Sequence, residues 1–382
     1  MKTAVHLGAG NIGRGFLGQL YWQSGWRTVF VDVLDEVVEA LNRRGCYPVH
    51  LVDERPQVLT IDRVRALHSR DAQAVSEALA ACDLASVSVG VANLARVAPL
   101  LAQGIERRAR TSHQPLDVVV CENLLDAAQR LRECVLAQSP QRCQPFVRQR
   151  VGFVATVVSR MVPVVPEEVR AEDPLHVAVE AYATLPVDAT AFVGGVPHVE
   201  GFLPVTNIEA HQRRKLFCHN CGHALCAYAG HRRGHALVAD AIADPPIREH
   251  VQAGLAETGR ALIARDGFEP AEHQAHIDDL LRRFANRALG DTVARVGRDP
   301  IRKLGPNDRL VGAARFCLDA GVEPTHVVRG VADALAYDNP QDAQAVRLQQ
   351  MLRREGLDAV LHRVCGLQPG QPLTTRIREI AQ

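Results

Sequence analysis

The chain lacks the features that mark membrane-spanning, secreted and nucleic-acid-binding proteins. Its apolar runs are far too short to cross a bilayer, and its first residues enter a strand pattern without the apolar segment of a signal peptide. The formal net charge is only +1, so no overall field attracts nucleic acid or a membrane surface. The ten cysteines follow no disulfide framework, and we expect reduced thiols in a cytoplasmic protein.

The basic residues of the C-terminal half also lack aromatic neighbours that could stack on bases. Pairs such as Arg282-Arg283 and Arg353-Arg354 are interleaved with acidic residues, which predicts solvated helix surfaces. We therefore expect a small-molecule ligand, no nucleic-acid or membrane partner, and a monomer or small homo-oligomer.

A nucleotide-binding pattern is present at the start of the sequence. Residues 4–7 form an apolar run typical of a buried parallel strand, and a G-x-G-x-x-G motif and a helical pattern follow it. The first two glycines allow a tight turn and the close approach of a pyrophosphate, and the third allows close packing of helix and strand. The phosphates would lie at the helix N-terminus, where unpaired N–H groups favour anions. The cofactor-binding positions expected here are Gly8, Gly10, Asn11, Ile12 and Gly13.

An acidic residue ends the second predicted strand. Residues 28–32 form an apolar run that closes with Asp32, 24 residues after Gly8. A carboxylate at this spacing can bond both ribose hydroxyls and would repel a 2′-phosphate, so we predict NAD rather than NADP.

Strand and helix patterns alternate through the first half and then give way to helices. Apolar stretches at 151–158 and 176–183 could extend a parallel sheet, whereas helical periodicity dominates from residue 206. Before residue 151 we expect helices near 35–44, 71–80 and 93–107, strands at 83–90 and 116–123, and a further helix from there to about residue 137. We predict an α/β Rossmann-type domain at residues 1–195 and an all-α domain at 205–382, with the active site in the cleft between them.

Three residues of the first long helical pattern after the Rossmann domain suit alcohol chemistry. At 100° per residue on an α-helix, Lys215, Asn220 and His223 span an arc of about 140°, so they can face one cleft. A lysine, an amide and a histidine are the types needed to take a proton from an alcohol and hold the oxyanion. The alternative is a solvated basic face, because Arg213 and Arg214 precede Lys215.

The same stretch offers a possible zinc site. His219 and His223 are four residues apart, with Cys218 and Cys221 close by, and a zinc alcohol dehydrogenase would use such ligands to polarise the alcohol. The cysteines project about 100° or more from the histidine face of a helix, and no further ligand motif is obvious. We therefore predict no metal, and we interpret His219 and the cysteines as packing residues.

Together these motifs resemble the polyol-specific long-chain dehydrogenases from residue 1 to about residue 360. The pattern Lys215-x4-Asn220-x2-His223 after a Rossmann domain is similar to the catalytic signature of that family. Further shared segments lie at 8–16, 121–123, 214–217, 222–224 and 296–304. The resemblance implies an NAD-dependent, metal-independent enzyme that interconverts a secondary alcohol of a linear polyol and a ketose.

The resemblance also implies a role for each catalytic residue. Lys215 would be the general base, with its pKa lowered by burial, while the hydride of the alcohol passes to the nicotinamide. Asn220 and Asn123 would donate hydrogen bonds to the developing oxyanion, and His223 would orient the substrate.

A cluster of cations suggests how the far end of the substrate is held. Arg295 and Lys303 match family positions that contact distal substrate oxygens, and Lys303 with Arg298 or Arg302 would anchor a terminal phosphate. The expected reaction is D-mannitol 1-phosphate + NAD+ = D-fructose 6-phosphate + NADH. The alternative is that these charges pair with helix carboxylates and stabilise the fold.

The sequence departs from the family where carboxylates are expected. Ser159 replaces an aspartate, Ala155 stands where an acid is frequent, and Gln212 and Arg213 precede the lysine where glutamate is usual. These changes alter the proton route from Lys215. They keep open another polyol or a modified sugar as substrate, and a non-catalytic NAD-binding relative.

Overall fold

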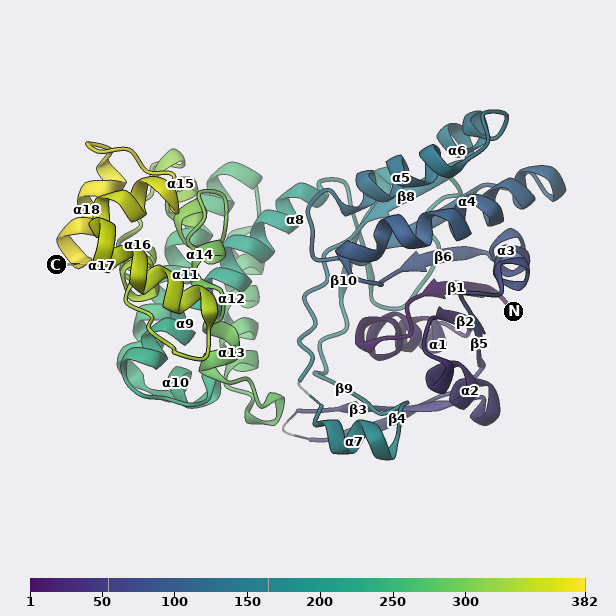
Figure 1. Cartoon of the computed structure of the whole chain (residues 1–382), viewed down its shortest axis with the longest axis horizontal. Helices are drawn as coiled ribbons and strands as arrows, with labels where there is room; N and C mark the ends of the chain where they lie inside the picture. Colours follow the sequence, from purple (N-terminus) through teal and green to yellow (C-terminus); the bar gives the residue numbers. More distant parts are fainter. Residues whose placement is uncertain (54, 164, 382) are drawn as a thin grey trace. The chain divides into compact units, whose positions relative to one another are not determined.

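The computed structural model describes residues 1–53, 55–163 and 165–381. The chain divides into two compact units, Met1–His211 (unit 1) and Gln212–Gln382 (unit 2). Figure 1 colours unit 1 purple to teal and unit 2 teal to yellow. Within the described residues, no helix is both long enough and apolar enough to cross a membrane.

Unit 1 is built on a parallel sheet of six strands in the order β5-β2-β1-β6-β7-β8. The strands are β1 (Thr3–Leu7), β2 (Arg27–Asp32), β5 (Val64–His68), β6 (Leu84–Val87), β7 (Leu116–Val120) and β8 (Val151–Ala155). The direction of strand order reverses between β1 and β6, which is the dinucleotide-binding arrangement. The predicted Rossmann-type fold is confirmed.

Helices cover both faces of this sheet because successive strand residues alternate between two apolar cores. Val5 and Leu7 lie in one core with residues of α3, α4 and α5, and Ala4 lies in the other with Phe16 and Leu17 of the π-helix η1 (Gly13–Gly18). The helices of unit 1 are α1 (Gln19–Gln23), α2 (Asp35–Arg44), α3 (Ala72–Ala81), α4 (Leu94–Thr111), α5 (Ala127–Gln138), α6 (Gln144–Arg150) and α7 (Glu167–Glu172).

One expected extension of the sheet is wrong. Residues 151–158 do supply its edge strand β8, but within 176–183 only β9 (Val177–Val179) forms, and it joins a separate sheet of order β4-β3-β9. Val177 and Val179 pack against Gly15, where an added Cβ would lie 2.7 Å from the Val179 side chain. These valines therefore cover the π-helix η1 instead of extending the main sheet beside β8. The other strands of unit 1 are β3 (Tyr47–Leu51), β4 (Gln57–Ile61), β10 (Leu185–Asp188) and β11 (Phe202–Val205).

Unit 2 is helical, as predicted. Its central helix α9 is apolar all round, with Leu225, Cys226 and Tyr228 fully buried, and it packs against α10, α11, α13 and α16 (Figure 1). The only β-type pairing among its described residues is the bridge between Leu237 and Thr292. The elements from residue 208 onward are α8 (Ile208–Arg214), the π-helix η4 (Lys215–Asn220), α9 (Cys221–Arg232), α10 (Val238–Ala243), α11 (Pro245–Asp266), α12 (Pro270–Phe284), α13 (Val293–Gly297), α14 (Pro300–Lys303), α15 (Val311–Asp319), α16 (Thr325–Leu335), α17 (Ala343–Arg363) and α18 (Pro372–Ala381).

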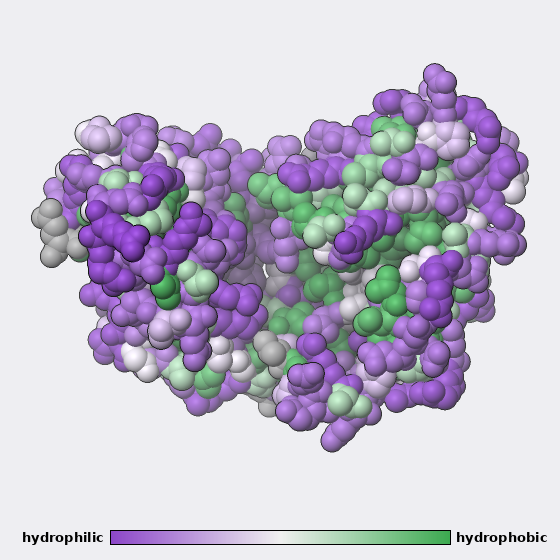
Figure 2. Space-filling model, in the orientation of Figure 1, coloured by the Kyte–Doolittle hydropathy of each residue, from purple (hydrophilic) through white to green (hydrophobic). Residues whose placement is uncertain are grey.

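The surface of unit 2 contrasts with its interior. Figure 2 shows that the face of unit 2 in view is predominantly hydrophilic. Its apolar residues are concentrated around α9, so buried charges within this unit need a specific explanation.

Candidate active site

The glycine turn of unit 1 has two packed positions and one open position. Gly8 has φ of 102°, and an added Cβ there would lie 2.5 Å from the Ser88 carbonyl oxygen. A Cβ at Gly13 would collide with the Gly8 carbonyl oxygen. A Cβ at Gly10 would meet no protein atom within 4 Å. Gly8 and Gly13 thus fix the turn, and Gly10 leaves its outer side free for a ligand.

The helix that follows the turn begins without a side-chain cap. The helix begins at Asn11, directly after Gly10, which has no side chain that could cap it, and residues Gly13–Gly18 form its π-helical segment η1. The N–H groups at this end therefore remain available to an anion. Buried Arg14 braces the turn, because its Nε donates to the Ala9 carbonyl oxygen at 2.6 Å.

Asp32 holds the turn from the end of β2. Its Oδ2 accepts the Ala9 N–H at 2.6 Å, and its Oδ1 accepts the N–H groups of Val33 and Leu34 at 2.8 and 3.0 Å. An ionised carboxylate offers about four acceptor sites, so at least one remains for a ribose hydroxyl. Val33 and Leu34 are 68% and 51% exposed, which gives an apolar surface beside this carboxylate.

The loops after β6 and β7 are joined by a half-buried carboxylate that directly precedes the exposed Asn123. The Glu122 side chain accepts the N–H groups of Val89 and Gly90, both at 2.8 Å, and burial raises its pKa. Asn123 is thereby fixed at the carboxyl edge of the sheet, the edge that carries the glycine turn.

The predicted α-helical arc of Lys215, Asn220 and His223 is wrong in its geometry. Residues Lys215–Asn220 form a turn of π-helix, and α9 begins at Cys221. Hydrogen bonds in a π-helix join residues five apart, so Asn220 comes close to lying below Lys215 along the axis. The wider turn therefore aligns the two side chains more closely than the arc of about 140° of an α-helix.

The environment of Lys215 favours its neutral form. Enclosure of the amine lowers its pKa to about 8, because burial disfavours the charged form, and the nearby Arg309 cation lowers it further. A lysine with this pKa can accept a proton near neutral pH.

His219 is buried in the π-helical turn, and His223, four residues later in α9, is 15% exposed. The His223 ring stacks on Phe284, with centroids 4.8 Å apart and planes inclined by 9°, and its Nε2 lies 3.5 Å from an Asp291 carboxylate oxygen. Burial and the Arg295 cation lower its pKa to about 3. The pKa of His219 is also lowered well below its usual value, by burial and then by Arg283. Both rings are therefore neutral at physiological pH.

The neighbouring cysteines are buried thiols. Burial raises the pKa of Cys218 to about 12 and raises that of Cys221 well above its usual value. In the described parts of the chain, no three His, Cys, Asp or Glu side chains lie close enough to hold a metal ion.

The predicted phosphate cluster is placed unevenly. Arg295 pairs with Asp291, and Lys303 is 5% exposed, with its ammonium donating to the Arg298 carbonyl oxygen. Burial, and then Arg309, lower the pKa of Lys303 to about 7. Arg302 is half exposed and pairs with Asp299 and Asp308, at 2.9 and 3.3 Å. Arg295 and Lys303 thus lie near His223, whose pKa both lower, whereas the Arg302 guanidinium is held by carboxylates.

Two further cations belong to this neighbourhood. Arg283 was predicted to lie on a solvated surface, but it is 3% exposed and lowers the pKa of both His219 and His223. It lies with Leu280 and Phe284 on the buried side of α12, and its guanidinium pairs with Asp279 at 3.5 Å. Arg309 was not singled out from the sequence, although it follows Lys303 by only six residues.

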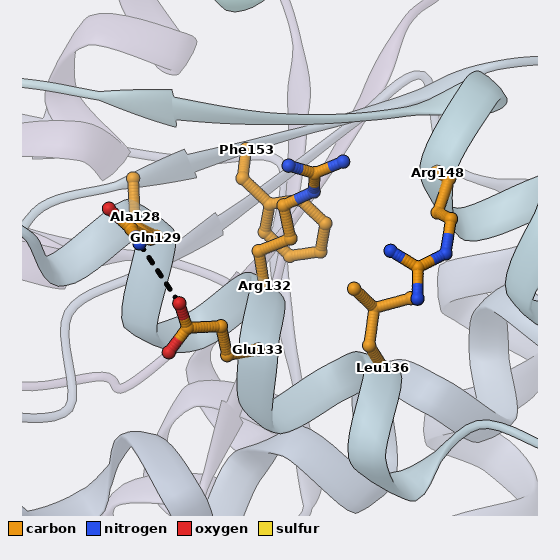
Figure 3. A pocket seen from close by; sticks show the side chains of 7 residues that line it. All are labelled: Ala128, Gln129, Arg132, Glu133, Leu136, Arg148 and Phe153. Atoms are coloured by element: carbon orange, nitrogen blue, oxygen red, sulfur yellow. Dashed lines mark hydrogen bonds between the residues drawn. The ribbon is translucent and has the colours of Figure 1, made fainter.

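A separate hollow of about 460 Å³ lies in unit 1 between α5, α6 and β8. Figure 3 shows Arg132 beside Phe153 and Arg148 next to Leu136. Gln129 donates a hydrogen bond to Glu133 at 2.9 Å. It contains none of the predicted site residues, and its walls lie away from the glycine turn in sequence and in the sheet order.

Comparison with known proteins agrees with this description. Residues 2–201 match the mannitol dehydrogenase Rossmann domain, and residues 207–379 match the mannitol dehydrogenase C-terminal domain. The chain is 41% identical over 371 residues to mannitol-1-phosphate 5-dehydrogenase of Bacillus licheniformis, covering 97% of both chains. It is 38% identical over 379 residues to the protein of that name from Brevibacillus brevis, covering 99% of this chain and 97% of the relative.

Solved structures share the fold at low sequence identity. A D-sorbitol dehydrogenase superposes with a TM-score of 0.82 at 17% identity, covering 99% of this chain and 92% of that one. Mannitol 2-dehydrogenase of Pseudomonas fluorescens, in complex with NAD and D-mannitol, gives 0.71 at 16% identity, covering 100% and 91%.

The Rossmann-type fold with its glycine turn in unit 1, and the lysine of low pKa in unit 2, are features of a nucleotide-dependent dehydrogenase. Since family-specific patterns match almost the whole chain, it belongs to the mannitol dehydrogenase family. This membership confirms the predicted polyol dehydrogenase family and the predicted class, an NAD-dependent dehydrogenase.

Two glycine variants should separate folding from cofactor binding. Gly13→Ala should lower the free energy of unfolding by roughly 1–3 kcal/mol, because its Cβ overpacks the turn. The free energy of unfolding of Gly10→Ala should stay within about 0.5 kcal/mol of that of the parent. This variant should bind NADH roughly tenfold more weakly, because its methyl group occupies the open side of the turn. Denaturant unfolding measures the stability and NADH fluorescence titration measures the cofactor affinity. Equal losses of stability in Gly10→Ala and Gly13→Ala would contradict the assignment of Gly10 as the open position.

Charge at Asp32 should control the choice of nicotinamide. Asp32→Asn keeps the shape and one acceptor oxygen but removes the charge that repels a 2′-phosphate. We expect the ratio of NADPH to NADH affinity to rise, with Asp35→Asn, a change at the exposed start of α2, as the matched control. An unchanged ratio in Asp32→Asn would contradict the role of this carboxylate.

Proposed function

We propose that the chain interconverts a linear sugar-alcohol phosphate and a ketose phosphate with NAD, most simply D-mannitol 1-phosphate and D-fructose 6-phosphate. The observation that carries the proposal is the enclosed Lys215, with a pKa near 8, in a turn shared with Asn220 and next to His223. Relatives named mannitol-1-phosphate 5-dehydrogenase, similar over nearly the full length, support the substrate.

Lys215 is the proposed general base of alcohol oxidation. Its neutral amine accepts the hydroxyl proton as the C–H hydride departs, and its ammonium returns that proton in ketose reduction. NAD, when bound, supplies the acceptor for the hydride, and Gly8, Gly10, Asn11, Ile12, Gly13 and Asp32 are the residues proposed to hold it. Asn220 and Asn123 are proposed to donate hydrogen bonds to the substrate oxygen as negative charge develops there.

Neutral His223 is proposed to orient a substrate hydroxyl. Stacking on Phe284 fixes the plane of the ring, and a neutral imidazole can donate through one nitrogen and accept through the other. Arg295 and Lys303 are the proposed contacts for the distal oxygens and the phosphate, with Arg298 or Arg302 as a second phosphate contact.

The pH dependence of the reaction tests Lys215. Its neutral form predominates above a pKa of about 8, so kcat for polyol oxidation should rise with pH and level off above that value. Ketose reduction needs the ammonium form, so its kcat should fall over the same range.

Lys215→Ala should lower kcat by roughly 10²–10⁴-fold and leave NADH affinity nearly unchanged. Near-normal turnover in this variant would remove Lys215 from the mechanism.

Substrate choice is tested by NADH oxidation with D-fructose 6-phosphate beside D-fructose. We expect a higher kcat/KM for the phosphorylated ketose, because the groups around His223 carry excess positive charge. A preference for fructose would reject the phosphate assignment. Activity on neither compound would favour a different polyol or a non-catalytic relative, and zinc bound in stoichiometric amount would favour the metal alternative.

A further inference from the structure

Arg309 is held by one edge of its guanidinium, immediately before α15. Its Nε donates to Asp308 Oδ1 at 2.8 Å, and its backbone N–H donates to the same oxygen at 2.7 Å. The other Asp308 oxygen lies 3.3 Å from Arg302 Nη1. Asp308 therefore orients Arg309 and shares its own charge between two cations.

The loop that carries Arg309 is tightly packed. A Cβ at Gly305 would lie 2.9 Å from the Arg302 carbonyl oxygen, and a Cβ at Gly312 would lie 2.7 Å from the backbone of Asn307. The following helix α15 packs on the π-turn of Lys215, since the rings of Phe316 and Phe217 lie 5.1 Å apart. The position of Arg309 is thus tied to the turn that carries the proposed base.

The outer edge of the Arg309 guanidinium keeps its donors for a ligand. A guanidinium has five N–H donors, and the hydrogen bond to Asp308 uses the one on Nε. Within the described part of the chain, neither terminal nitrogen has a hydrogen-bond acceptor. Neither is among the buried polar atoms that lack a partner, and the Arg309 side chain is 17% exposed. They therefore contact solvent in this structure and can form the two parallel bonds that a phosphate accepts.

The charges around Arg309 are mostly positive. Its cation lowers the pKa of Lys215, His223 and Lys303, so it is an electrostatic neighbour of all three. The nearby carboxylates of Asp291 and Asp308 already pair with Arg295 and with Arg302 and Arg309. Because Lys303 has a pKa of about 7, it is only partly charged near neutrality, whereas an arginine stays charged.

We propose that Arg309 is a specificity-determining residue that binds the substrate phosphate through its terminal guanidinium nitrogens and so favours phosphorylated over neutral polyols. The inference deepens the proposed function and rests on it. Arg309 lies outside the segment 295–303, and its guanidinium carries the permanent positive charge that Lys303 lacks.

The test compares Arg309→Gln and Arg309→Lys with the parent enzyme on two ketoses. For Arg309→Gln, kcat/KM for fructose 6-phosphate should fall roughly 10- to 100-fold, the range for one charge-assisted contact, and mainly through KM. Activity on fructose should stay within about threefold, because no bond to the neutral substrate is lost. Arg309→Lys, which keeps the charge but loses the planar fork, should be intermediate.

Arg353→Gln is the matched control, since Arg353 lies on the exposed surface of α17. This variant removes one positive charge and should leave kcat/KM for both ketoses unchanged. Inorganic phosphate provides a readout that needs no turnover. It should raise the melting temperature of the parent and of Arg353→Gln, but raise that of Arg309→Gln much less, because a ligand stabilises the state that binds it.

The outcomes separate this inference from the proposed function. If the parent prefers fructose 6-phosphate and Arg309→Gln keeps that preference and the phosphate-induced shift, Arg309 does not bind the phosphate. Equal losses on both ketoses with a lowered melting temperature would assign Arg309 a structural role and also overturn the inference. A parent without any preference for the phosphorylated ketose would reject the proposed function, and an undiminished phosphate shift in Arg309→Gln would then still reject the inference.

Discussion

The enclosure of the Lys215 amine is the constraint on which the proposed chemistry depends. An ammonium loses hydration when it is buried, so the free energy of the charged form rises and the pKa falls to about 8. The turn that carries the lysine is π-helical, a geometry that occurs often at functional sites and that aligns Asn220 with it. The buried helix α9 follows directly and anchors this turn in the core of unit 2.

Concentration of positive charge is the second consequence of this arrangement. Arg283 and Lys303 are two of the charged side chains buried in unit 2; Arg283 pairs with Asp279 at 3.5 Å, and Arg309 is an electrostatic neighbour of Lys303 with its terminal nitrogens open to solvent. Buried cations are costly unless they are paired or await an anion. The Asp291 and Asp308 carboxylates already pair with Arg295 and with Arg302 and Arg309, and the positive charge that remains around Lys303 and Arg309 supports the proposed anionic substrate.

The sequence predicts features that depend on local chemistry better than those that depend on distant contacts. The G-x-G-x-x-G turn could be predicted because Gly8 and Gly13 each have a local steric requirement, and Asp32 because it ends the second strand. The sheet partner of β9 could not, since its valines pack on Gly15, far away in the chain. Hydrophobic periodicity assumes an α-helix, so it misses the π-helical turn at Lys215. The sequence Arg282-Arg283 does not reveal which of the two arginines is buried, and in the structure it is Arg283.

The most direct measurement is the pKa of the Lys215 amine itself. Proteins labelled with ¹⁵N-lysine, with the resonance assigned by comparison with Lys215→Met, can be titrated by NMR without substrate. The account predicts a midpoint near pH 8 that moves upward when inorganic phosphate binds, because an added anion stabilises the ammonium. A midpoint near the usual lysine value, unaffected by phosphate, would contradict both the enclosed base and the cationic site around it.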